Sequence, residues 1–168
     1  MSDFDITRYL PYLVNRTGIR IAAAFTGEFR EHGITLQMWR VLAALDHADG
    51  QRISDLAALT SIDVSTLSRI LDQMQDKGLI ERRRGNGRGS AKGRGADARV
   101  VTVHAIKQGR SITAKLIPRA RHYEAVALSG FSPAEAEALK AMLTRIFDNV
   151  AILEAEAKSE ADGADEAA

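Results

Sequence analysis

The sequence has no cysteine, few aromatic residues and no long hydrophobic run. Without cysteine among its 168 residues, the chain has no disulfide, no thiolate metal site and no thiol redox sensor. No apolar run approaches the roughly 20 residues that a membrane span requires, and no signal-peptide pattern opens the chain. The 45% of residues that are hydrophobic suffice for a sizeable core. We therefore expect a cytoplasmic protein with no membrane contact, made of one domain or of two small ones.

The sequence also lacks the common signatures of catalysis. The segment from Gly85 to Ser90 resembles a dinucleotide fingerprint, but it does not end on the required residue or open a helix. The four histidines, His32, His47, His104 and His122, lack the spacing of a metal site. No Ser-His-Asp pattern surrounds a nucleophile turn. We expect a protein that is not an enzyme and has no cofactor or metal.

The net charge of +1 conceals an uneven distribution along the chain. Residues 77–122 contain thirteen lysines and arginines against two acidic residues, whereas residues 154–168 contain six acidic residues and one basic residue. Clustered positive charge is typical of a nucleic-acid-binding surface. The acidic, alanine-rich segment 154–168 is typical of a disordered tail.

Residues 53–76 have the pattern of two short helices joined by a turn. The first helix and the turn have an apolar side formed by Leu56, Leu59 and Ile62, with Ala57 as the small contact residue. Asp63 is suited to cap the second helix, in which apolar residues recur at helical spacing. These residues are Val64, Leu67, Ile70, Leu71 and Met74. The pattern predicts a helix-turn-helix with Ser61 in the turn, where glycine is more usual.

The opposite face of the second helix carries short hydroxyls and an arginine instead of the Glu and Lys of an ordinary surface helix. Its members are Ser65, Thr66, Ser68, Arg69, Asp72 and Gln73. Hydroxyls and arginine suit base edges and phosphates in a DNA major groove. All of these except Asp72 are therefore candidate DNA contacts. Helix pairs that bind nothing also carry such faces, so this pattern alone leaves the function open.

A basic, glycine-rich segment follows the second helix. Lys77 and Gly78 end the helix, an apolar strand begins at Leu79, and a second β-rich strand runs from Arg99 to Val103. Five of the eleven residues from Gly85 to Gly95 are glycine, so this loop cannot pack a core. The pattern predicts a wing that reaches the minor groove. Its expected phosphate contacts are Arg82, Arg83, Arg84, Arg88, Lys92 and Arg94.

Other interpretations of the wing can be weighed against duplex DNA. A solvated charged hairpin would repel itself without a polyanion nearby. A protein that binds single strands or RNA would stack bases on aromatic side chains, and residues 82–99 contain none. Duplex DNA is favoured, with a non-specific architectural protein as the remaining alternative.

The segment resembles the MarR family of bacterial transcription regulators, in which a winged helix is joined to a helical dimerisation domain. The matching positions are Lys77 to Ile80, Asp97-Ala98-Arg99, Val100 to Val103 and Lys107 to Arg110. The resemblance implies that Arg99 enters the minor groove and that Asp97 helps to hold the wing. It extends over roughly residues 5 to 153. The wing is longer and richer in glycine and arginine than is usual, and Ala105-Ile106 replaces a common Leu-Thr pair.

The remaining segments have helical patterns. One helix is expected over residues 5–32, with Pro11 in its first turns, and a second from Thr35 to about Ala48. Ser54 is expected to cap the first helix of the DNA-binding pair. After the wing, a helix should run from about residue 106 to 127, and a capping box from Ser132 to Glu135 should open the last helix. That helix has an apolar stripe formed by Leu139, Met142, Leu143, Ile146, Phe147 and Val150.

The expected fold class is mainly α with a small β-hairpin wing, a winged helix-turn-helix plus a helical dimerisation domain. Residues 1–34 would form an N-terminal dimerisation helix, residues 35–104 the DNA-binding region with its wing at 82–99, and residues 105–153 the C-terminal dimerisation helices. The apolar stripes of the first and last helices either pack within the chain or form a homodimer interface. The resemblance favours the homodimer, which would match a palindromic operator in double-stranded DNA.

The resemblance further implies that a small effector, commonly an aromatic or phenolic acid or its coenzyme A thioester, releases the protein from DNA. The residues near the expected junction of the two regions are Tyr9, Tyr12, Arg16, Arg20, Met38, Trp39, Arg40 and His122. Arginines beside aromatic side chains suit an acidic aromatic ligand, although each residue taken alone is more typical of a core or a surface. The expected function is a sequence-specific transcriptional repressor that such a ligand controls.

Overall fold

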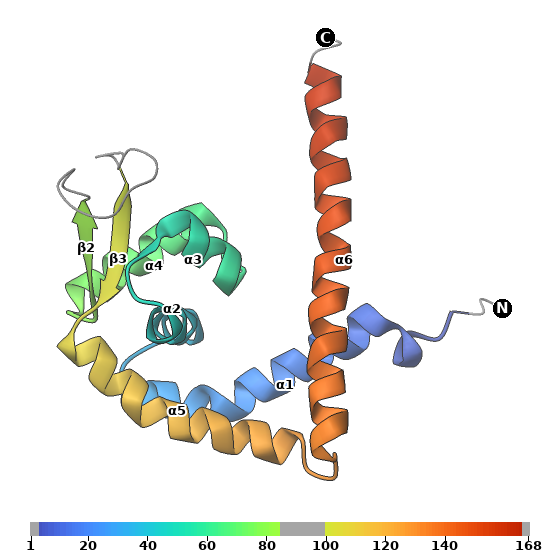
Figure 1. The fold of residues 1–168 in the computed structure, drawn as a ribbon, viewed down its shortest axis with the longest axis horizontal. Coiled ribbons are helices and arrows are strands. Elements are labelled where there is room, and N and C mark those ends of the chain that lie inside the picture. The colour runs from blue at the N-terminus through green and yellow to red at the C-terminus, as the bar shows by residue number, and fades with distance from the viewer. Residues whose placement is uncertain (1–3, 85–99, 166–168) are drawn as a thin grey trace. The chain divides into compact units, whose positions relative to one another are not determined.

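The computed structural model describes residues 4–84 and 100–165, with side chains as far as residue 153. The chain divides into two compact units, one that ends at Glu124 and one that begins at Ala125. In chain order the elements are η1 (Ile6–Arg8), α1 (Leu10–Glu31), α2 (Leu36–His47), β1 (Gln51–Arg52), α3 (Ile53–Thr60), α4 (Val64–Asp76), β2 (Ile80–Arg84), β3 (Val101–Ala105), α5 (Lys107–Ala127) and α6 (Pro133–Asp165) (Figure 1). The predicted class, mainly α with a small winged-helix sheet, is confirmed.

A three-stranded antiparallel sheet in the order β1-β3-β2 belongs to the first unit. Strands β2 and β3 pair from Ile80 opposite Ala105 to Arg84 opposite Val101. The predicted hairpin is confirmed, although its second strand begins at Val101, two residues later than expected. Strand β1, in which Arg52 lies opposite Thr102, was not predicted. A strand of two residues has too few positions to show a periodic pattern in the sequence. It forms because its backbone pairs with β3.

The core of the winged-helix region lies between α2, α3, α4 and the sheet. Its completely buried side chains are Val41, Leu42, Leu56, Leu67, Leu71, Met74 and Val103, each 0% exposed. Burial of a large aliphatic side chain contributes about 1.5–3 kcal/mol. Because these residues come from three helices and a strand, each element is held by the others and the position of α4 is set by the whole core.

Several predicted helix ends are confirmed. The Thr35 hydroxyl accepts a hydrogen bond from the amide of Met38 at 3.2 Å and caps α2. Gly33 and Gly78, which follow α1 and α4, have φ of 62° and 66°, a conformation that favours glycine. The cap expected at Ser54 was wrong, because α3 begins at Ile53 directly after β1 and has no side-chain cap.

The expected single helix from residue 5 is divided into two parts. Asp5 caps the short turn η1 by accepting a hydrogen bond from the amide of Thr7 at 2.9 Å. Tyr9 is extended, with φ −74° and ψ 117°, and α1 begins at Leu10 with Pro11 in its first turn. A residue before proline is disfavoured in the helical region, so Leu10 and Pro11 suit a helix start better than a helix interior.

The turn of the helix-turn-helix contains a residue in an uncommon conformation. Ser61 has φ 53° and is the only described non-glycine residue with a positive φ. The amide of Ile62 donates to the carbonyl of Ala57 at 3.2 Å and closes the turn. Leu59 and Val64, which were predicted to pack, are instead 57% and 55% exposed. Leu59 lies near the end of α3 and Val64 at the start of α4. Both flank the turn, where the two helices diverge and do not bury these side chains.

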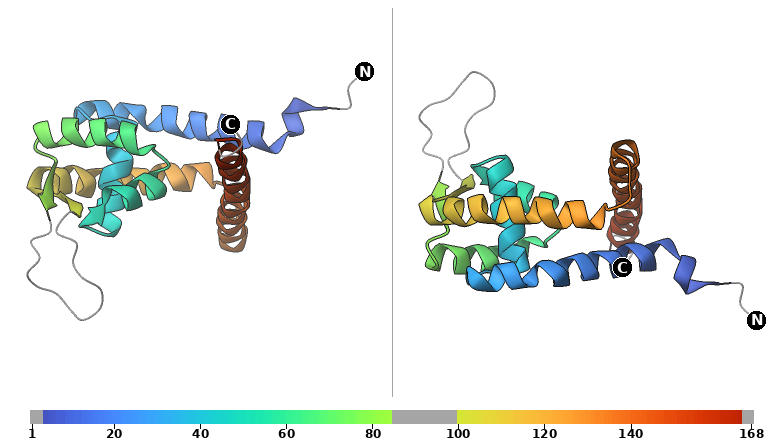
Figure 2. Two further views of the ribbon diagram at one scale, coloured as in Figure 1. Left: turned by 90° about the horizontal axis from the view of Figure 1, so that it is seen from above. Right: turned by 90° about the horizontal axis from the view of Figure 1, so that it is seen from below.

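Helices α1 and α5 run side by side in the first unit (Figure 2). Arg119 of α5 forms an ion pair with Glu28 of α1, with Nε 2.9 Å from the carboxylate. The rings of Phe25 and Phe29 contact that of Trp39 on α2, with centroids 5.9 and 6.3 Å apart. Polar and aromatic contacts therefore join the long helices to the winged-helix core.

In the second unit, α6 begins at the predicted capping box. The hydroxyl of Ser132 accepts from the amide of Glu135 at 3.3 Å, and Glu135 Oε2 accepts from the amide of Ser132 at 2.8 Å. The sequence favoured a disordered tail after residue 153, but α6 continues to Asp165. Alanine and glutamate, which dominate residues 154–165, are strong helix formers. Among the described residues, no helix combines the length and apolar character needed to cross a membrane.

Candidate nucleic-acid interface

Helix α4 presents the predicted polar face to solvent. Asp63 caps the helix by accepting hydrogen bonds from the hydroxyl of Ser65 at 2.7 Å and the amide of Thr66 at 2.8 Å. Hydrogen bonds from Ser65 and Thr66 hold the pKa of the Asp63 carboxyl well below its usual range, so the cap is ionised. Leu67, Leu71 and Met74 are buried. Of the predicted DNA contacts on α4, the exposed ones are Ser65, Thr66, Arg69 and Gln73, whereas Ser68 is half-buried.

Strand β2 places three consecutive arginines beside α4, but they are not equivalent. Arg82 forms an ion pair with Asp72, and its guanidinium donates to the carbonyl of Ser68 at 3.0 Å. It therefore braces β2 against α4, and the prediction that it serves as a phosphate contact does not fit this geometry. Arg83 is exposed and pairs with Glu81 of the same strand. Arg84 is exposed and has no ion pair with another described residue.

The other predicted wing contacts lie outside the described residues. They are Arg88, Lys92, Arg94, Asp97 and Arg99. Within the described residues, Arg69 on α4 and Arg83 and Arg84 on β2 are the exposed cations among the predicted contacts. A polar helix face beside a basic strand can contact both base edges and phosphates.

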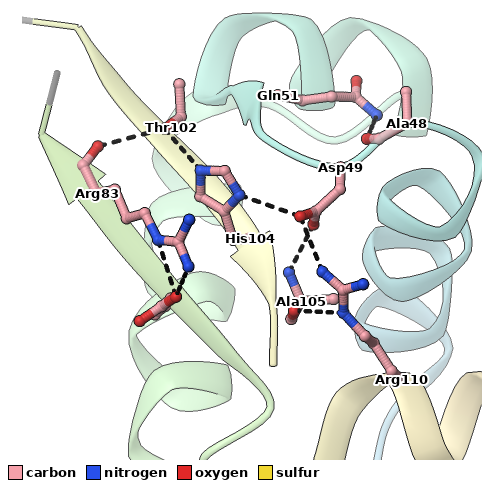
Figure 3. A network of polar contacts seen from close by, with 9 residues as sticks. Ala48, Asp49, Gln51, Arg83, Thr102, His104, Ala105 and Arg110 are labelled. Carbon is pink, nitrogen blue, oxygen red and sulfur yellow. Dashed lines mark hydrogen bonds and ion pairs between the residues drawn. The ribbon is translucent and has the colours of Figure 1, made fainter. Parts of the chain in front are cut away.

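Sequence reasoning missed a polar network at the C-terminal end of β3, and Asp49 is at its centre (Figure 3). The Asp49 carboxylate accepts from the amide of Ala105 at 2.8 Å and from the Arg110 guanidinium at 3.1 Å. It also lies 3.1 Å from Nδ1 of His104, whose Nε2 is 3.0 Å from the Thr102 hydroxyl. Asp49 thus joins the turn after α2 to β3 and to the first turns of α5. Its partners are 55 to 61 positions away in sequence, so local spacing gave no signal for them.

The network sets the charge state of Asp49. Burial opposes ionisation, but the amide of Ala105, the His104 ring and the Arg110 guanidinium outweigh it and lower the pKa of the carboxyl below its ordinary value. A lowered pKa stabilises the fold above the unfolded-state pKa, about 3.9 for aspartate, and this stabilisation is lost as pH falls through the folded-state pKa.

We therefore expect Asp49→Asn to lower the free energy of unfolding by about 1 kcal/mol at pH 7, a figure discounted for partial exposure. The difference from the unmodified protein should begin to shrink below about pH 4, where the unfolded chain is protonated first, and it should be smallest below the folded-state pKa, where both states have lost the carboxylate. Denaturant titrations between pH 3 and 7 measure this difference. Asp46→Asn is the matched control, because Asp46 is an exposed neighbour on α2 and its substitution should have almost no effect. An equal pH dependence of both variants would rule out the stabilising role of Asp49.

The structure does not bring the eight predicted ligand residues together. Met38 is buried in the core, and Trp39 packs against the aromatic rings of α1. Tyr9 lines a separate shallow site with Phe4, Asp5 and Arg8, whereas Tyr12 and Arg16 contact each other on α1, with the guanidinium carbon 5.8 Å from the ring centroid. Arg20 and His122 are exposed. Position along the sequence of a helix does not give spatial proximity, so these residues do not form one site in the described single chain.

Two of the predicted ligand residues do line one hollow. Trp39 and Arg40 of α2 border a cavity of about 370 Å³ between α2 and the end of α3. Its remaining lining residues are Ala43, Ala44, His47, Leu59 and Thr60. This volume lies within the range of small-molecule sites, about 300–1,000 Å³. In the described part of the chain, no group of three or more His, Asp or Glu residues is arranged to hold a metal ion.

Comparisons with known proteins agree on one family. A family model described as MarR family matches residues 32–89, which include α2, α3, α4 and β2. A MarR family transcriptional regulator from Silicibacter pomeroyi DSS-3 is 32% identical, with 88% of this chain and 99% of that chain covered and a TM-score of 0.70. The uncharacterised HTH-type transcriptional regulator YdgJ of Bacillus subtilis (strain 168) is 28% identical over 123 residues, which cover 73% of this chain and 70% of that protein.

A third protein shares the fold. It is BpsR of Bordetella bronchiseptica, whose structure describes regulation of DNA binding by 6-hydroxynicotinic acid. It is 23% identical, with 82% of this chain and 97% of that chain covered and a TM-score of 0.68. The winged-helix geometry and the match over nearly the whole length of the Silicibacter regulator lead to the same conclusion. The chain belongs to the MarR family of DNA-binding transcriptional regulators.

Proposed function

We propose that this protein is a homodimeric, sequence-specific repressor that binds a palindromic operator and is released by a small aromatic acid. The exposed polar face of α4, held beside the arginines of β2 by the Arg82–Asp72 ion pair, is the observation that carries the proposal. In this arrangement α4 enters the major groove, and β2 directs the wing toward the adjacent minor groove. A dimer seated on a promoter represses by blocking polymerase, with no further contact surface required.

The apolar stripes of α1 and α6 support the dimer. Residues of both stripes are exposed in the single chain, among them Leu13, Val14 and Ile21 on α1 and Met142, Leu143 and Phe147 on α6. Large exposed apolar faces of this kind mark interaction surfaces. A two-fold dimer would present two copies of α4 to half-sites roughly 34–36 Å apart on the duplex.

A duplex selected by the protein from random sequence tests the function directly. It should be two-fold symmetric and bind roughly 10³-fold or more tightly than random duplex. Equal, steeply salt-dependent binding to both duplexes would instead identify a non-specific architectural protein.

Two arginine variants separate base reading from phosphate contact. Arg69→Ala should weaken binding to the selected duplex by about 1–3 kcal/mol, or roughly 5- to 150-fold, and change random-duplex binding much less. Arg84→Ala should weaken binding to both duplexes by a similar factor. It should also make the decrease of log affinity with log salt concentration less steep, by about one unit of slope. Fluorescence anisotropy at two or more salt concentrations distinguishes these patterns. If both variants lose affinity in the same way, the assignment of Arg69 to a base is wrong.

The hollow beside Trp39 and Arg40 is the proposed effector site. Its walls are largely apolar, with the side chains of Arg40 and His47 at its border. An aromatic carboxylate would place its ring between Trp39 and Leu59 and its charge at Arg40. Bound ligand in this position would alter the packing of α2 against α3 and so the position of α4.

This proposal predicts that one substitution can weaken effector binding without weakening operator binding. Arg40→Ala should keep operator binding but lower the affinity for benzoate or 6-hydroxynicotinate roughly tenfold or more, because a charged hydrogen bond is lost. Ligand-induced thermal shift and release of labelled operator measure both properties. Arg20→Ala is the control, because Arg20 is exposed on α1 and does not line this hollow. A response lost in Arg20→Ala but retained in Arg40→Ala would place the effector elsewhere.

A further inference from the structure

Val64 is an exposed apolar side chain at the first residue of α4. It belongs by spacing to the same helical pattern as Leu67, Leu71 and Met74, which are 0% exposed. Val64 itself is 55% exposed, so the core does not use it. An exposed β-branched residue also contributes nothing to helix propensity, since valine is a poorer helix former than alanine. Neither core packing nor helix formation therefore accounts for valine at this position.

The polar groups beside Val64 are already engaged within the helix cap. Ser65 donates its hydroxyl hydrogen to Asp63 at 2.7 Å, and Thr66 donates its amide hydrogen to the same oxygen at 2.8 Å. The ionised Asp63 carboxylate repels phosphates and the acceptor atoms of bases. At the first position of α4, the methyl groups of Val64 therefore present an exposed apolar surface that can approach a base pair without breaking the cap.

Val64 lies on the edge of α4 that β2 contacts. Val64, Ser68 and Asp72 are spaced four residues apart and so lie along one edge of α4. Arg82 of β2 contacts this edge, through the Ser68 carbonyl and the Asp72 carboxylate. Val64 is the N-terminal member of the row, and the N-terminal residues of a recognition helix are those that meet base edges.

We propose that Val64 is a specificity-determining residue that contacts the 5-methyl group of a thymine in each half-site. The inference rests on the proposed function, in which α4 enters the major groove. Thymine is the base that displays a methyl group in this groove, and apolar side chains recognise it by contact. Removal of one methyl from such a contact should weaken binding about fourfold.

Deoxyuridine provides a direct test, because it removes the thymine methyl and preserves every hydrogen-bonding atom. The selected duplex is prepared with single thymines replaced by deoxyuridine, and each form is titrated with the unmodified protein and with Val64→Ala. At one position in each half-site, the replacement should lower the affinity of the unmodified protein about fourfold and that of Val64→Ala not at all. Double replacement in both half-sites should give roughly the product, about 15-fold.

Val126→Ala is the matched control, since Val126 is a similarly exposed valine on α5, outside both the DNA interface and the hollow beside Trp39. It should retain the full sensitivity to deoxyuridine. Val64→Ala folds with unchanged stability if Val64 is outside the core, which thermal unfolding verifies. If no position loses its sensitivity in Val64→Ala, the inference is overturned while sequence-specific binding stands. If the unmodified protein prefers no duplex at all, the proposed function is overturned together with it.

Discussion

Gly109→Ala is expected to lower the free energy of unfolding by about 3 kcal/mol or more, the upper end of the usual cost of overpacking. A Cβ at this position would lie 2.2 Å from the carbonyl oxygen of Leu79 and 3.1 Å from Cδ2 of Leu42. The nearer atom is backbone, and it accepts a hydrogen bond from the amide of Ile106 at 3.1 Å. Relief of the clash must therefore displace either the start of β2 or the start of α5.

A second glycine-to-alanine substitution provides the control. Gly27 lies inside α1, and a Cβ there would meet nothing within 4 Å. Gly27→Ala should raise the free energy of unfolding by up to about 1 kcal/mol, because alanine is the better helix former and restricts the unfolded chain. Denaturant unfolding of both variants should thus give opposite signs. Unchanged stability in Gly109→Ala would mean that α5 does not pack against Leu79 as described.

The features that depend on neighbouring residues could be predicted from sequence. Asp63 and Thr35 each cap a helix by accepting a hydrogen bond from an amide three positions later in the sequence, and the capping box at Ser132 is equally local. The buried row of α4 follows from helical periodicity, and the hairpin from two β-rich segments around a basic loop. The winged helix-turn-helix architecture was predictable because each of its parts leaves a short-range pattern in the sequence.

The features that depend on distant residues could not be predicted in this way. Charge counting grouped Arg82 with the phosphate contacts, because it cannot show that Asp72 on α4 lies within reach of this side chain. Asp49 has only a turn signal in the sequence, and its role arises from contacts with β3 and α5. The predicted effector residues were taken from three helices, and the sequence does not specify how each helix is rotated about its axis.

Periodicity also fails where a packed neighbour ends. It assigned Leu59 and Val64 to the interior because their spacing is correct, yet both are more than half exposed beside the turn. In α6 the same periodicity marks an apolar stripe, but four of its six residues are exposed in the single chain. An apolar pattern thus identifies a surface suited to burial, and only the fold shows whether the chain itself covers it.

Phe147→Glu is expected to convert the protein to a monomer and to lower its affinity for the two-fold symmetric duplex about 100-fold or more. Phe147 is 62% exposed in the single chain, so a glutamate there costs the chain's own packing little. In the proposed dimer the same position would bury a carboxylate without a partner, which is strongly unfavourable. A monomer contacts one half-site and loses the gain from linked binding, about 10²- to 10⁴-fold.

Ala141→Glu is the matched control, because Ala141 is exposed and lies on another face of α6 from the apolar stripe. It adds the same charge and should leave both dimerisation and operator binding unchanged. Sedimentation measures the mass of each variant, and titration of full-site and half-site duplexes measures binding. Phe147→Glu should bind an isolated half-site as well as the control does, since α4 and β2 are untouched. A Phe147→Glu protein that stays dimeric and binds the full site normally would show that the stripe of α6 is not the interface, and the two-fold symmetry would then have to come from another surface, such as that of α1.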